Sequence, residues 1–485
     1  MKNLLAKIQL SMYFLIPVFI ITLFGFYACQ EKQSIKKVKP DAKQKPNILL
    51  LLADDLGYGD LSCYGSPSVF TPNIDKLGQD GTRFTNFYAG SAVCTPSRAS
   101  LLTGQFPFRF NILGHFSSDS EYLPDGIITI PHILKKAGYY TAHIGKWHLG
   151  GVSPSVADDR KNNYQPGPGE HGFDDYLVMD EGPNSERASL LTKNRMYRDG
   201  ASFCRLNDQK LPESNKFLTD YQTDWAIEMI NQAKGKKPFY IQVWFDAPHT
   251  PYEPAPGLAI DMYKSQGVSG DQLLWRSMVE NLDMNIGRVM SCLDSLGLTE
   301  NTLVIFTSDN GPAFQGSPGP FRGGKTDLHE GGIRVPLIIH WSGQVDSAQV
   351  TAQPAHMVDM LPTFAALAGV EVDMENQDGM NLLPNWLEGQ RLEHKPMFWQ
   401  IIKYDTYQNQ GPRPMPHATT AMVDGYWKLL ADGTVPTELF DLNNDHRELY
   451  NLLENYPDKG QKLLNKLNWV INESRQSIED SLTIK

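Results

Sequence analysis

Two runs of apolar residues constrain the fold of this chain most strongly. Residues 47–53 and 302–307 are almost entirely apolar and show no alternation with polar residues. Such runs are typical of strands buried on both faces, as in the centre of a parallel sheet. Helix-like segments lie between the strand-like ones, for example 220–233 before 238–245. We therefore predict an α/β fold with a large central, mostly parallel sheet flanked by helices.

Both apolar runs end in oxygen-bearing side chains. Asp54 and Asp55 follow the first run, and Asp309 and Asn310 follow the second after one serine. Because the carboxyl ends of parallel strands meet at one edge of a sheet, we expect all four side chains to lie around one cation. Their oxygens suit Ca²⁺ or Mg²⁺. An isolated Asp-Asp pair is more often a solvated turn, so the prediction depends on the convergence of the two pairs.

The alternation of helices and strands fades after about residue 370. Four short strand-like segments follow, over 397–402, 419–423, 426–430 and 438–442. They predict a smaller C-terminal antiparallel sheet, closed by a helix over 453–471. We expect a main α/β domain over 46–370 and an α+β subdomain over 371–485. Residues 151–218 show little periodicity, so we expect long loops there.

Residues 94–104, Cys-Thr-Pro-Ser-Arg-Ala-Ser-Leu-Leu-Thr-Gly, predict a short helix with a reactive N-terminus. Pro96 fits its first turn and Gly104 can end it. Cys94 then lies at the N-terminus, where the helix dipole favours an anion and is expected to lower the thiol pKa. Arg98 lies about one turn along and can point to the same place. The arrangement suits an oxyanion substrate, whereas an isolated cysteine is usually a small buried hydrophobic residue.

Three other segments place cations and histidines near the ends of predicted strands. Lys146 and His148 lie in Gly-Lys-Trp-His-Leu-Gly, where an extended backbone would put both on one face. His249 follows the strand-like segment 238–245, and Lys325 lies in a glycine-rich stretch. Lysine and imidazole can hold an oxyanion and move protons. Taken singly, such residues are more often solvated.

The string Cys-x-Pro-Ser-Arg followed by Leu-Thr-Gly resembles the signature of the type I sulfatases, in the alkaline-phosphatase-like superfamily. The resemblance extends from about Lys45 to the region 438–442, and its motifs occur in the order of the family. It implies that a sulfatase-maturing enzyme oxidises Cys94 to formylglycine, whose hydrate is the nucleophile. It also implies hydrolysis of sulfate esters.

The resemblance further implies a role for each candidate residue. One calcium ion per chain would be held by oxygen atoms of Asp54, Asp55, Asp309, Asn310 and the modified Cys94. The residues that bind the sulfate or activate the nucleophile would be Arg98, Lys146, His148, His249 and Lys325. One departure concerns the segment after Gly172-Phe173, where some members carry a serine and this chain continues with Asp174.

Three functions are compatible with these residues. The first is a sulfatase acting on a sulfated polysaccharide or oligosaccharide. The second is a phosphate or phosphonate monoesterase of the same superfamily; the greater charge of phosphate favours two metal ions, and the ligands account for one. The third is a non-catalytic glycan-binding surface lipoprotein, which the complete set of matching catalytic positions disfavours. Candidate substrate contacts are Arg187, Lys193, Arg195, Arg198, Arg413 and His417.

The N-terminus predicts export. Residues 1–28 combine a short basic start with a long uncharged apolar run, which is typical of an export signal. Phe26-Tyr27-Ala28-Cys29 loosely resembles a lipoprotein cleavage box. We expect lipidation of Cys29, a tether over 29–45, and a protein in the periplasm or at the cell surface. A simple secretory signal and an uncleaved membrane anchor are the alternatives.

Charge and cysteine spacing exclude some kinds of site. The formal net charge of −11 disfavours nucleic acid as a partner. The five cysteines have no CxxC spacing, which argues against a zinc or iron–sulfur site. Cys63, Cys204 and Cys292 could include one disulfide, but the sequence does not select a pair.

Overall fold

The computed structural model describes residues 45–116, 121–153, 161, 164–181, 185–257, 259–403 and 418–483. The predicted export signal, Cys29 and two of the candidate substrate contacts, Arg413 and His417, lie outside the described residues. Within the described ranges, no helix has both the length and the apolar character needed to cross a membrane.

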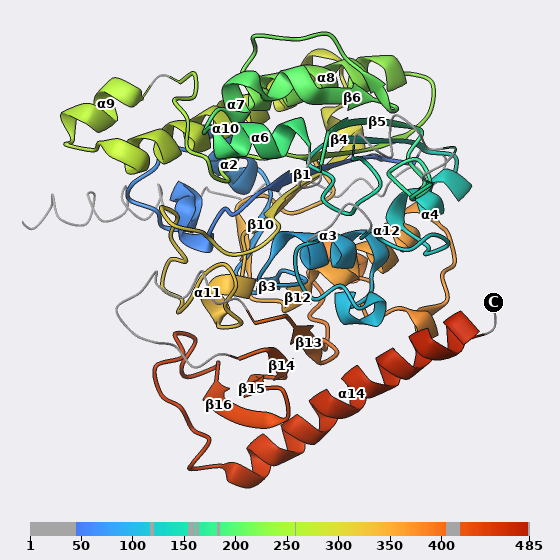
Figure 1. The fold of residues 1–485 in the computed structure, drawn as a ribbon, viewed down its shortest axis with the longest axis vertical. Coiled ribbons are helices and arrows are strands. Elements are labelled where there is room, and N and C mark those ends of the chain that lie inside the picture. Colours follow the sequence, from blue (N-terminus) through green and yellow to red (C-terminus); the bar gives the residue numbers. More distant parts are fainter. Residues whose placement is uncertain are drawn as a thin grey trace, which may run out of the picture. The chain divides into compact units, whose positions relative to one another are not determined.

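A ten-stranded sheet forms the framework of this part of the chain (Figure 1). At its centre β1 (Asn47–Ala53) lies between β8 (Phe239–Trp244) and β9 (Thr302–Ser308), parallel to both. The parallel part continues from β8 through β4 (Tyr140–Gly145) to β5 (Asp175–Met179). The remaining strands are β2 (Thr82–Phe84), β6 (Cys204–Leu206), β7 (Gln209–Lys210), β10 (Leu337–His340) and β11 (Gln349–Thr351). The strand order is β11-β2-β10-β9-β1-β8-β4-β5-β6-β7, which confirms the predicted fold class.

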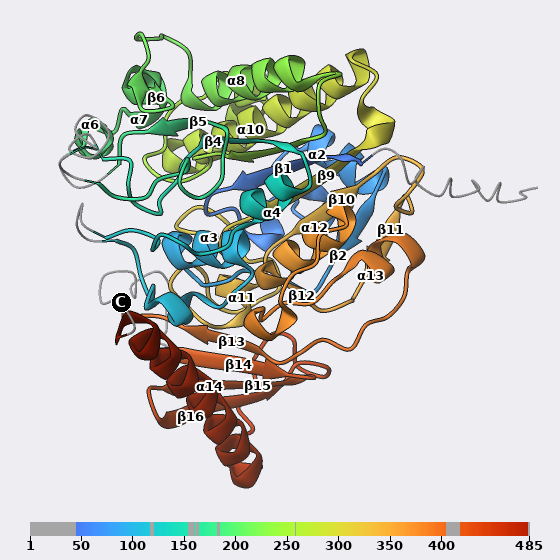
Figure 2. The ribbon, with the colours of Figure 1, turned by 90° about the vertical axis from the view of Figure 1, so that its right-hand side faces the viewer.

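Helices cover both faces of the sheet, as Figure 2 shows. Every residue of β1 is buried, and its side chains alternate between two cores. One core is shared with α3 (Cys94–Thr103), α4 (Ile130–Lys136) and α12 (Met360–Ala368). The other is shared with α2 (Pro72–Gln79), α8 (Leu218–Ala233) and α10 (Gly270–Ser295). Burial on both faces explains why the β1 sequence is apolar without alternation.

Several short elements complete the α/β part. The region 151–218 contributes β5, which extends the parallel sheet, besides the expected loops. The short elements are β3 (Phe87–Tyr88), the 3₁₀ helix η3 (Pro107–Phe110), α6 (Glu186–Thr192), α7 (Met196–Asp199), α9 (Ile260–Ser265), α11 (Glu330–Ile333), β12 (Ala355–His356) and α13 (Leu383–Glu388).

The predicted C-terminal sheet is confirmed. Its antiparallel strands are β13 (Met397–Gln400), β14 (Thr420–Asp424), β15 (Trp427–Asp432) and β16 (Val435–Asp441). The long helix α14 (Pro457–Thr483) lies across this sheet in Figure 2. Leucines of α14, among them Leu463 and Leu467, pack with Leu429 and Leu439 of the sheet.

Buried ion pairs join this small sheet to the glycine-rich segment that carries Lys325. Lys428 of β15 lies 2.9 Å from Glu330 and 2.8 Å from Glu448, and all three are buried. His329 lies between two carboxylates, with Nδ1 2.6 Å from Asp327 and Nε2 2.8 Å from Glu438 of β16. These contacts attach the segment to β15 and β16.

We expect His329 to make the stability of the protein depend on pH. Burial alone would lower the pKa of His329, but the Asp327 and Glu438 carboxylates outweigh this effect and raise the pKa to about 9. Its stabilising contribution is therefore complete below an unfolded-state pKa of about 6.5 and disappears as the pH rises through about 9. Between these two pH values, the contribution of His329 to the free energy of unfolding falls by about 3 kcal/mol. Urea unfolding of wild type and His329→Gln between these pH values should show profiles that converge at high pH, and parallel profiles would contradict the assignment.

Candidate active site

The two predicted pairs of oxygen-bearing residues meet at the carboxyl ends of β1 and β9. The strands are in register, with Ala53 opposite Ser308, so the residues that follow them are neighbours. The Asp55 backbone N–H donates to Asp309 Oδ1 at 3.1 Å, and Asn310 Nδ2 donates to Asp55 Oδ1 at 2.8 Å. Asp54, Asp55, Asp309 and Asn310 are all buried. The convergence predicted from the strand ends is therefore present.

The N-terminus of α3 brings Cys94 and Arg98 to the same place. Cys94 Sγ lies 3.4 Å from Asp54 Oδ1. Arg98 Nη2 lies 2.7 Å from Asp309 Oδ2 and 3.3 Å from Asp54 Oδ2, and its side chain is fully buried. The Ser97 hydroxyl donates to the backbone carbonyl of Asp309 and fixes the helix against the end of β9.

The expected lowering of the Cys94 pKa is wrong. Burial, followed by the negative charge of Asp54, raises the pKa of the Cys94 thiol well above its usual value. Desolvation of a thiolate and its proximity to carboxylates outweigh the field of one helix N-terminus. Unmodified Cys94 is consequently a protonated thiol, which is neither an effective nucleophile nor a suitable ligand for a hard cation.

Two lysines and a histidine lie next to the carboxylates of Asp54 and Asp55. Lys146 Nζ forms an ion pair with Asp54, and Lys325 Nζ lies 2.8 Å from Asp55 Oδ2. His249 Nε2 lies 3.6 Å from the same Asp55 oxygen, while its Nδ1 is 2.5 Å from the carbonyl oxygen of Thr250. Burial alone would lower the pKa of Lys325, but Asp55 raises it well above its usual value. Asp54 likewise outweighs burial and raises the pKa of Lys146. Both ammonium groups are therefore charged and can attract an oxyanion.

The glycine-rich segment folds back closely on itself around Lys325, and only glycine permits this packing. A Cβ atom on Gly332 would lie 1.8 Å from the carbonyl oxygen of Asp327, so no other residue fits there. The backbone N–H of Lys325 donates to the carbonyl of Pro312 at 2.9 Å. The close packing fixes the position of Lys325.

His148 reaches the cluster by a route that differs from the extended backbone expected from the sequence. β4 ends at Gly145, and His148 has a φ of 57°. Its backbone N–H donates to both carboxylate oxygens of Glu181 at 2.8 Å. Burial, followed by the charge of Lys146, lowers the pKa of His148 well below its usual value, so the imidazole is neutral.

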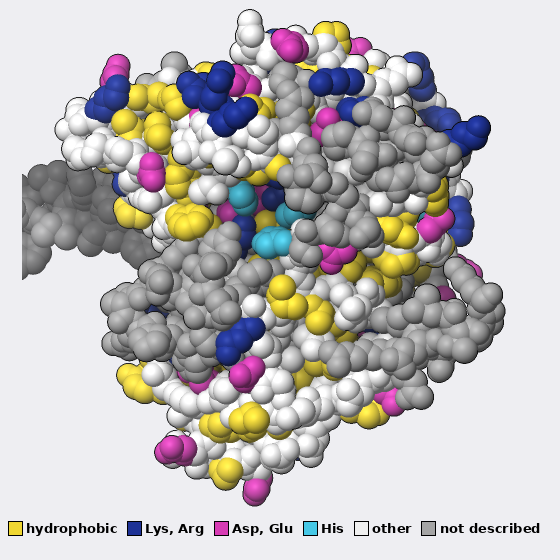
Figure 3. Space-filling model, viewed as in Figure 1, with side chains coloured by type: hydrophobic (Ala, Val, Ile, Leu, Met, Phe, Trp, Pro, Cys, Tyr) yellow, Lys and Arg dark blue, Asp and Glu magenta, His cyan; other side chains and the backbone are white. Residues whose placement is uncertain are grey.

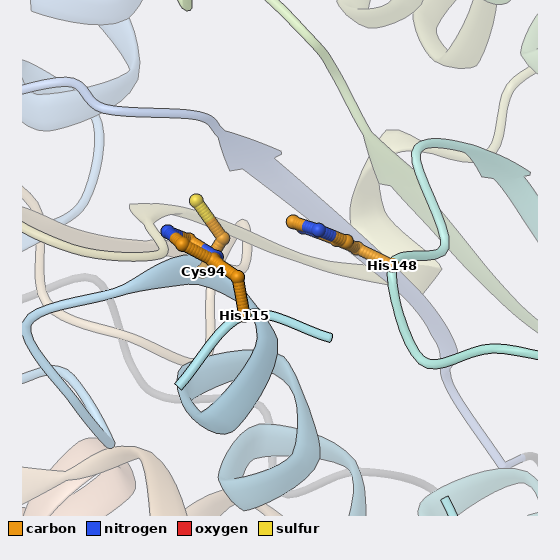
Figure 4. A group of neighbouring side chains, drawn as sticks. All are labelled: Cys94, His115 and His148. Carbon is orange, nitrogen blue, oxygen red and sulfur yellow. The ribbon is translucent and has the colours of Figure 1, made fainter. Parts of the chain in front are cut away.

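The structure adds one histidine that the sequence analysis missed. The ring of His115 stacks on that of His148, with centroids 5.4 Å apart and an interplanar angle of 13°. One nitrogen from each ring and Cys94 Sγ all lie within 4.8 Å of one another, and Figure 4 shows both rings beside Cys94. A single histidine in a segment without periodicity carries no signal that could have identified it.

The site opens to the surface on its histidine side. His115, His148 and His249 are partly exposed, whereas Lys146 and Lys325 are buried. Figure 3 shows histidine side chains in a hollow, with acidic and basic side chains behind them. A small anion entering this hollow would meet the histidines first and the ammonium groups deeper.

The donor set suits a hard divalent cation. Three buried carboxylates converge, and donor atoms of Asp54, Asp55, Cys94 and His249 lie within 4.8 Å of one another. Asn310 Oδ1 is buried and, among the described residues, has no hydrogen-bond partner. A buried oxygen of this kind can act as a metal ligand. Carboxylate and amide oxygens are the ligands that Ca²⁺ prefers.

The structure describes four of the predicted substrate contacts, and three of them form ion pairs with carboxylates. Arg187 is mostly buried and lies 3.2 Å from Asp246, so it is not a surface residue. Arg195 pairs with Asp199 at 2.6 Å and Arg198 with Glu253 at 3.0 Å. Lys193 is exposed. The sequence left open a disulfide among Cys63, Cys204 and Cys292, but all three are free thiols in the structure.

Comparison with known proteins identifies the family. The sulfatase family model matches residues 46–370, and the model of the C-terminal part of N-sulphoglucosamine sulphohydrolase matches residues 324–477. Human N-acetylgalactosamine-6-sulfatase is 36% identical over 387 residues, which cover 74% of this chain and 69% of that protein. Bovine arylsulfatase A is 32% identical over 457 residues, covering 87% and 86%.

Solved structures agree with the family assignment. The crystal structure of Ps i-CgsB in complex with k-i-k-neocarrahexaose has a TM-score of 0.72 and 27% identity, and the match covers 89% of this chain and 92% of that one. A structure described under the metabolism of multiple glycosaminoglycans by Bacteroides thetaiotaomicron also has a TM-score of 0.72 and 27% identity, covering 88% and 100%. The chain therefore belongs to the type I sulfatase family of the alkaline-phosphatase-like superfamily and is a sulfuric ester hydrolase.

Proposed function

We propose that the protein removes sulfate from a sulfated polysaccharide or oligosaccharide, using a formylglycine made from Cys94 and one calcium ion. The observation that carries the proposal is the arrangement of Lys146, Lys325 and Arg98 around Cys94 and three buried carboxylates. The carbohydrate substrate is supported by a relative named N-acetylgalactosamine-6-sulfatase and by the solved complex with k-i-k-neocarrahexaose.

The calcium site is proposed on Asp54, Asp55, Asp309, Asn310 and residue 94. When bound, the ion would withdraw electrons from an oxygen of residue 94 and from the sulfate. Arg98 orients two carboxylates of the set, since it pairs with both Asp309 and Asp54. Lys146 and Lys325 then neutralise sulfate oxygens as negative charge develops on them.

Conversion of Cys94 to formylglycine would replace its sulfur by oxygen, which can act as nucleophile and as calcium ligand. The thiol lies among carboxylates and its pKa is raised, so sulfur supplies neither a thiolate nor a calcium ligand. The hydrate of formylglycine would supply the attacking oxygen at this position. His148 is neutral and its Nδ1 is buried without a hydrogen-bond partner among the described residues, so it can accept a proton from residue 94.

Lys325 and His249 are the candidates for protonating the leaving alcohol. Lys325 carries a proton, because Asp55 holds its pKa above the usual range despite burial. The Nδ1 of His249 faces a carbonyl oxygen, which can only accept, so Nδ1 bears hydrogen and Nε2 faces Asp55. Burial lowers the pKa of His249, so the ring is neutral and its Nε2 can only accept a hydrogen bond. We therefore assign the proton transfer to the leaving alcohol at Nζ of Lys325.

A substrate panel tests this function. Matured enzyme, coexpressed with a sulfatase-maturing enzyme, should release sulfate from at least one sulfated glycosaminoglycan or carrageenan oligosaccharide. Its kcat/KM for an aryl sulfate should exceed that for the corresponding aryl phosphate by about 100-fold, because the ligands account for one cation. Preference for phosphate would favour the monoesterase alternative. The absence of any turnover would favour a glycan-binding protein.

Four further statements stay predictions from the sequence. They are export through residues 1–28, lipidation of Cys29, the tether over 29–45, and the division into parts at about residue 370.

A further inference from the structure

His115 occupies a position that neither the cation cluster nor the proposed proton transfers use. It lies in the segment after η3, which follows directly from the helix that carries Cys94. One of its ring nitrogens lies within 4.8 Å of Cys94 Sγ. The charges of Lys325, Lys146 and Asp55 are close enough to shift its pKa, so the ring borders the site.

The depth of the surrounding groups indicates which part of a substrate His115 would meet. The side chains of Lys146 and Lys325 are 1% and 4% exposed, so the sulfate oxygens that they bind lie deep in the hollow. His115 is partly exposed and therefore lies nearer the surface. A sulfate ester with its sulfur beside residue 94 must direct its carbohydrate toward the surface, which is the side that His115 occupies.

The chemistry of imidazole matches a hydroxyl group. The positive charge needed by the sulfate is already supplied by Lys146 and Lys325. A neutral imidazole offers one donor and one acceptor nitrogen, and a hydroxyl can use either. We propose that His115 is a specificity-determining residue that hydrogen-bonds a sugar hydroxyl close to the sulfate ester, a role that rests on the proposed function.

The test compares a sugar-containing with a sugar-free ligand. The variants are His115→Ala and His115→Gln, each matured like wild type. The sugar substrate is the sulfated oligosaccharide that wild type desulfates fastest in the panel, and the sugar-free probe is inorganic sulfate as a competitive inhibitor. His115→Ala should lower kcat/KM for the sugar by about 10- to 100-fold. The inhibition constant for sulfate should change by less than about twofold, and His115→Gln should recover part of the activity because its amide also donates and accepts.

A matched control is available in the same segment. Asn111 is exposed and has a φ of 56°, which glycine adopts readily, so Asn111→Gly should behave like wild type. An unchanged kcat/KM in His115→Ala, or equal weakening of sugar turnover and sulfate inhibition, would overturn the role of His115. No turnover by wild type across the panel would instead overturn the proposed function.

Discussion

Replacing Cys94 by alanine should abolish turnover, with kcat lowered by about 10⁴-fold or more, as expected when a covalent nucleophile is removed. Alanine cannot be converted to an aldehyde, and the remaining cations can bind sulfate without attacking it. The measurement is sulfate release from the best oligosaccharide of the panel, by wild type and variant coexpressed with the same maturing enzyme. Inhibitor binding should survive, since Lys146 and Lys325 are intact.

Two controls separate chemistry from folding. Cys292→Ser changes another free, partly buried thiol, which lies on α10, and should keep full activity. Wild-type protein made without the maturing enzyme should be as inactive as Cys94→Ala, because burial and Asp54 keep the thiol protonated. Substantial turnover by Cys94→Ala would show that another group attacks sulfur.

Removing divalent cations should have the second-largest effect. Chelation is expected to lower kcat by about 1000-fold, since a Lewis acid at the reacting oxygen supplies several kcal/mol. It should also lower the melting temperature, because an ion that binds only the folded chain stabilises it by about 3 kcal/mol at 100 times its Kd. Adding Ca²⁺ back should restore both properties, as measured by activity and thermal unfolding on the same sample.

The carboxylates allow a matched comparison for the metal. Asp55→Ala removes a buried member of the cluster and should eliminate the response to Ca²⁺. Asp174→Asn changes a partly exposed carboxylate that pairs with Lys135 at 2.9 Å, and it should respond like wild type. Identical melting temperatures and rates with and without chelator in wild type would exclude a functional calcium site.

The fold and the centre of the site could be predicted because they follow from short-range patterns. Burial on both faces makes the β1 sequence uniformly apolar, so the strand is visible without knowledge of its neighbours. Since β1 and β9 pair in register, the residues after each strand must meet, which brings Asp55 next to Asp309. The roles of these residues came from the family resemblance.

Other features depend on contacts between residues that are distant in sequence, and a local sequence pattern does not predict such contacts. The pKa of Cys94 is set by burial and by Asp54, which is distant in sequence, so the helix N-terminus alone predicted the wrong direction. Arg187 was predicted only as a candidate substrate contact, and its ion pair with the buried Asp246 could not be foreseen. The ring of His115 stacks against that of His148, a contact that the sequence does not reveal.

The most direct test of the mechanism is the chemical state of residue 94 in active enzyme. Peptide mass spectrometry of several preparations, matured to different extents, would give the fraction that carries the aldehyde. We predict that kcat per protein molecule rises in proportion to this fraction and extrapolates to zero for the unmodified thiol. Full activity in a preparation whose residue 94 is entirely unmodified cysteine would contradict the account.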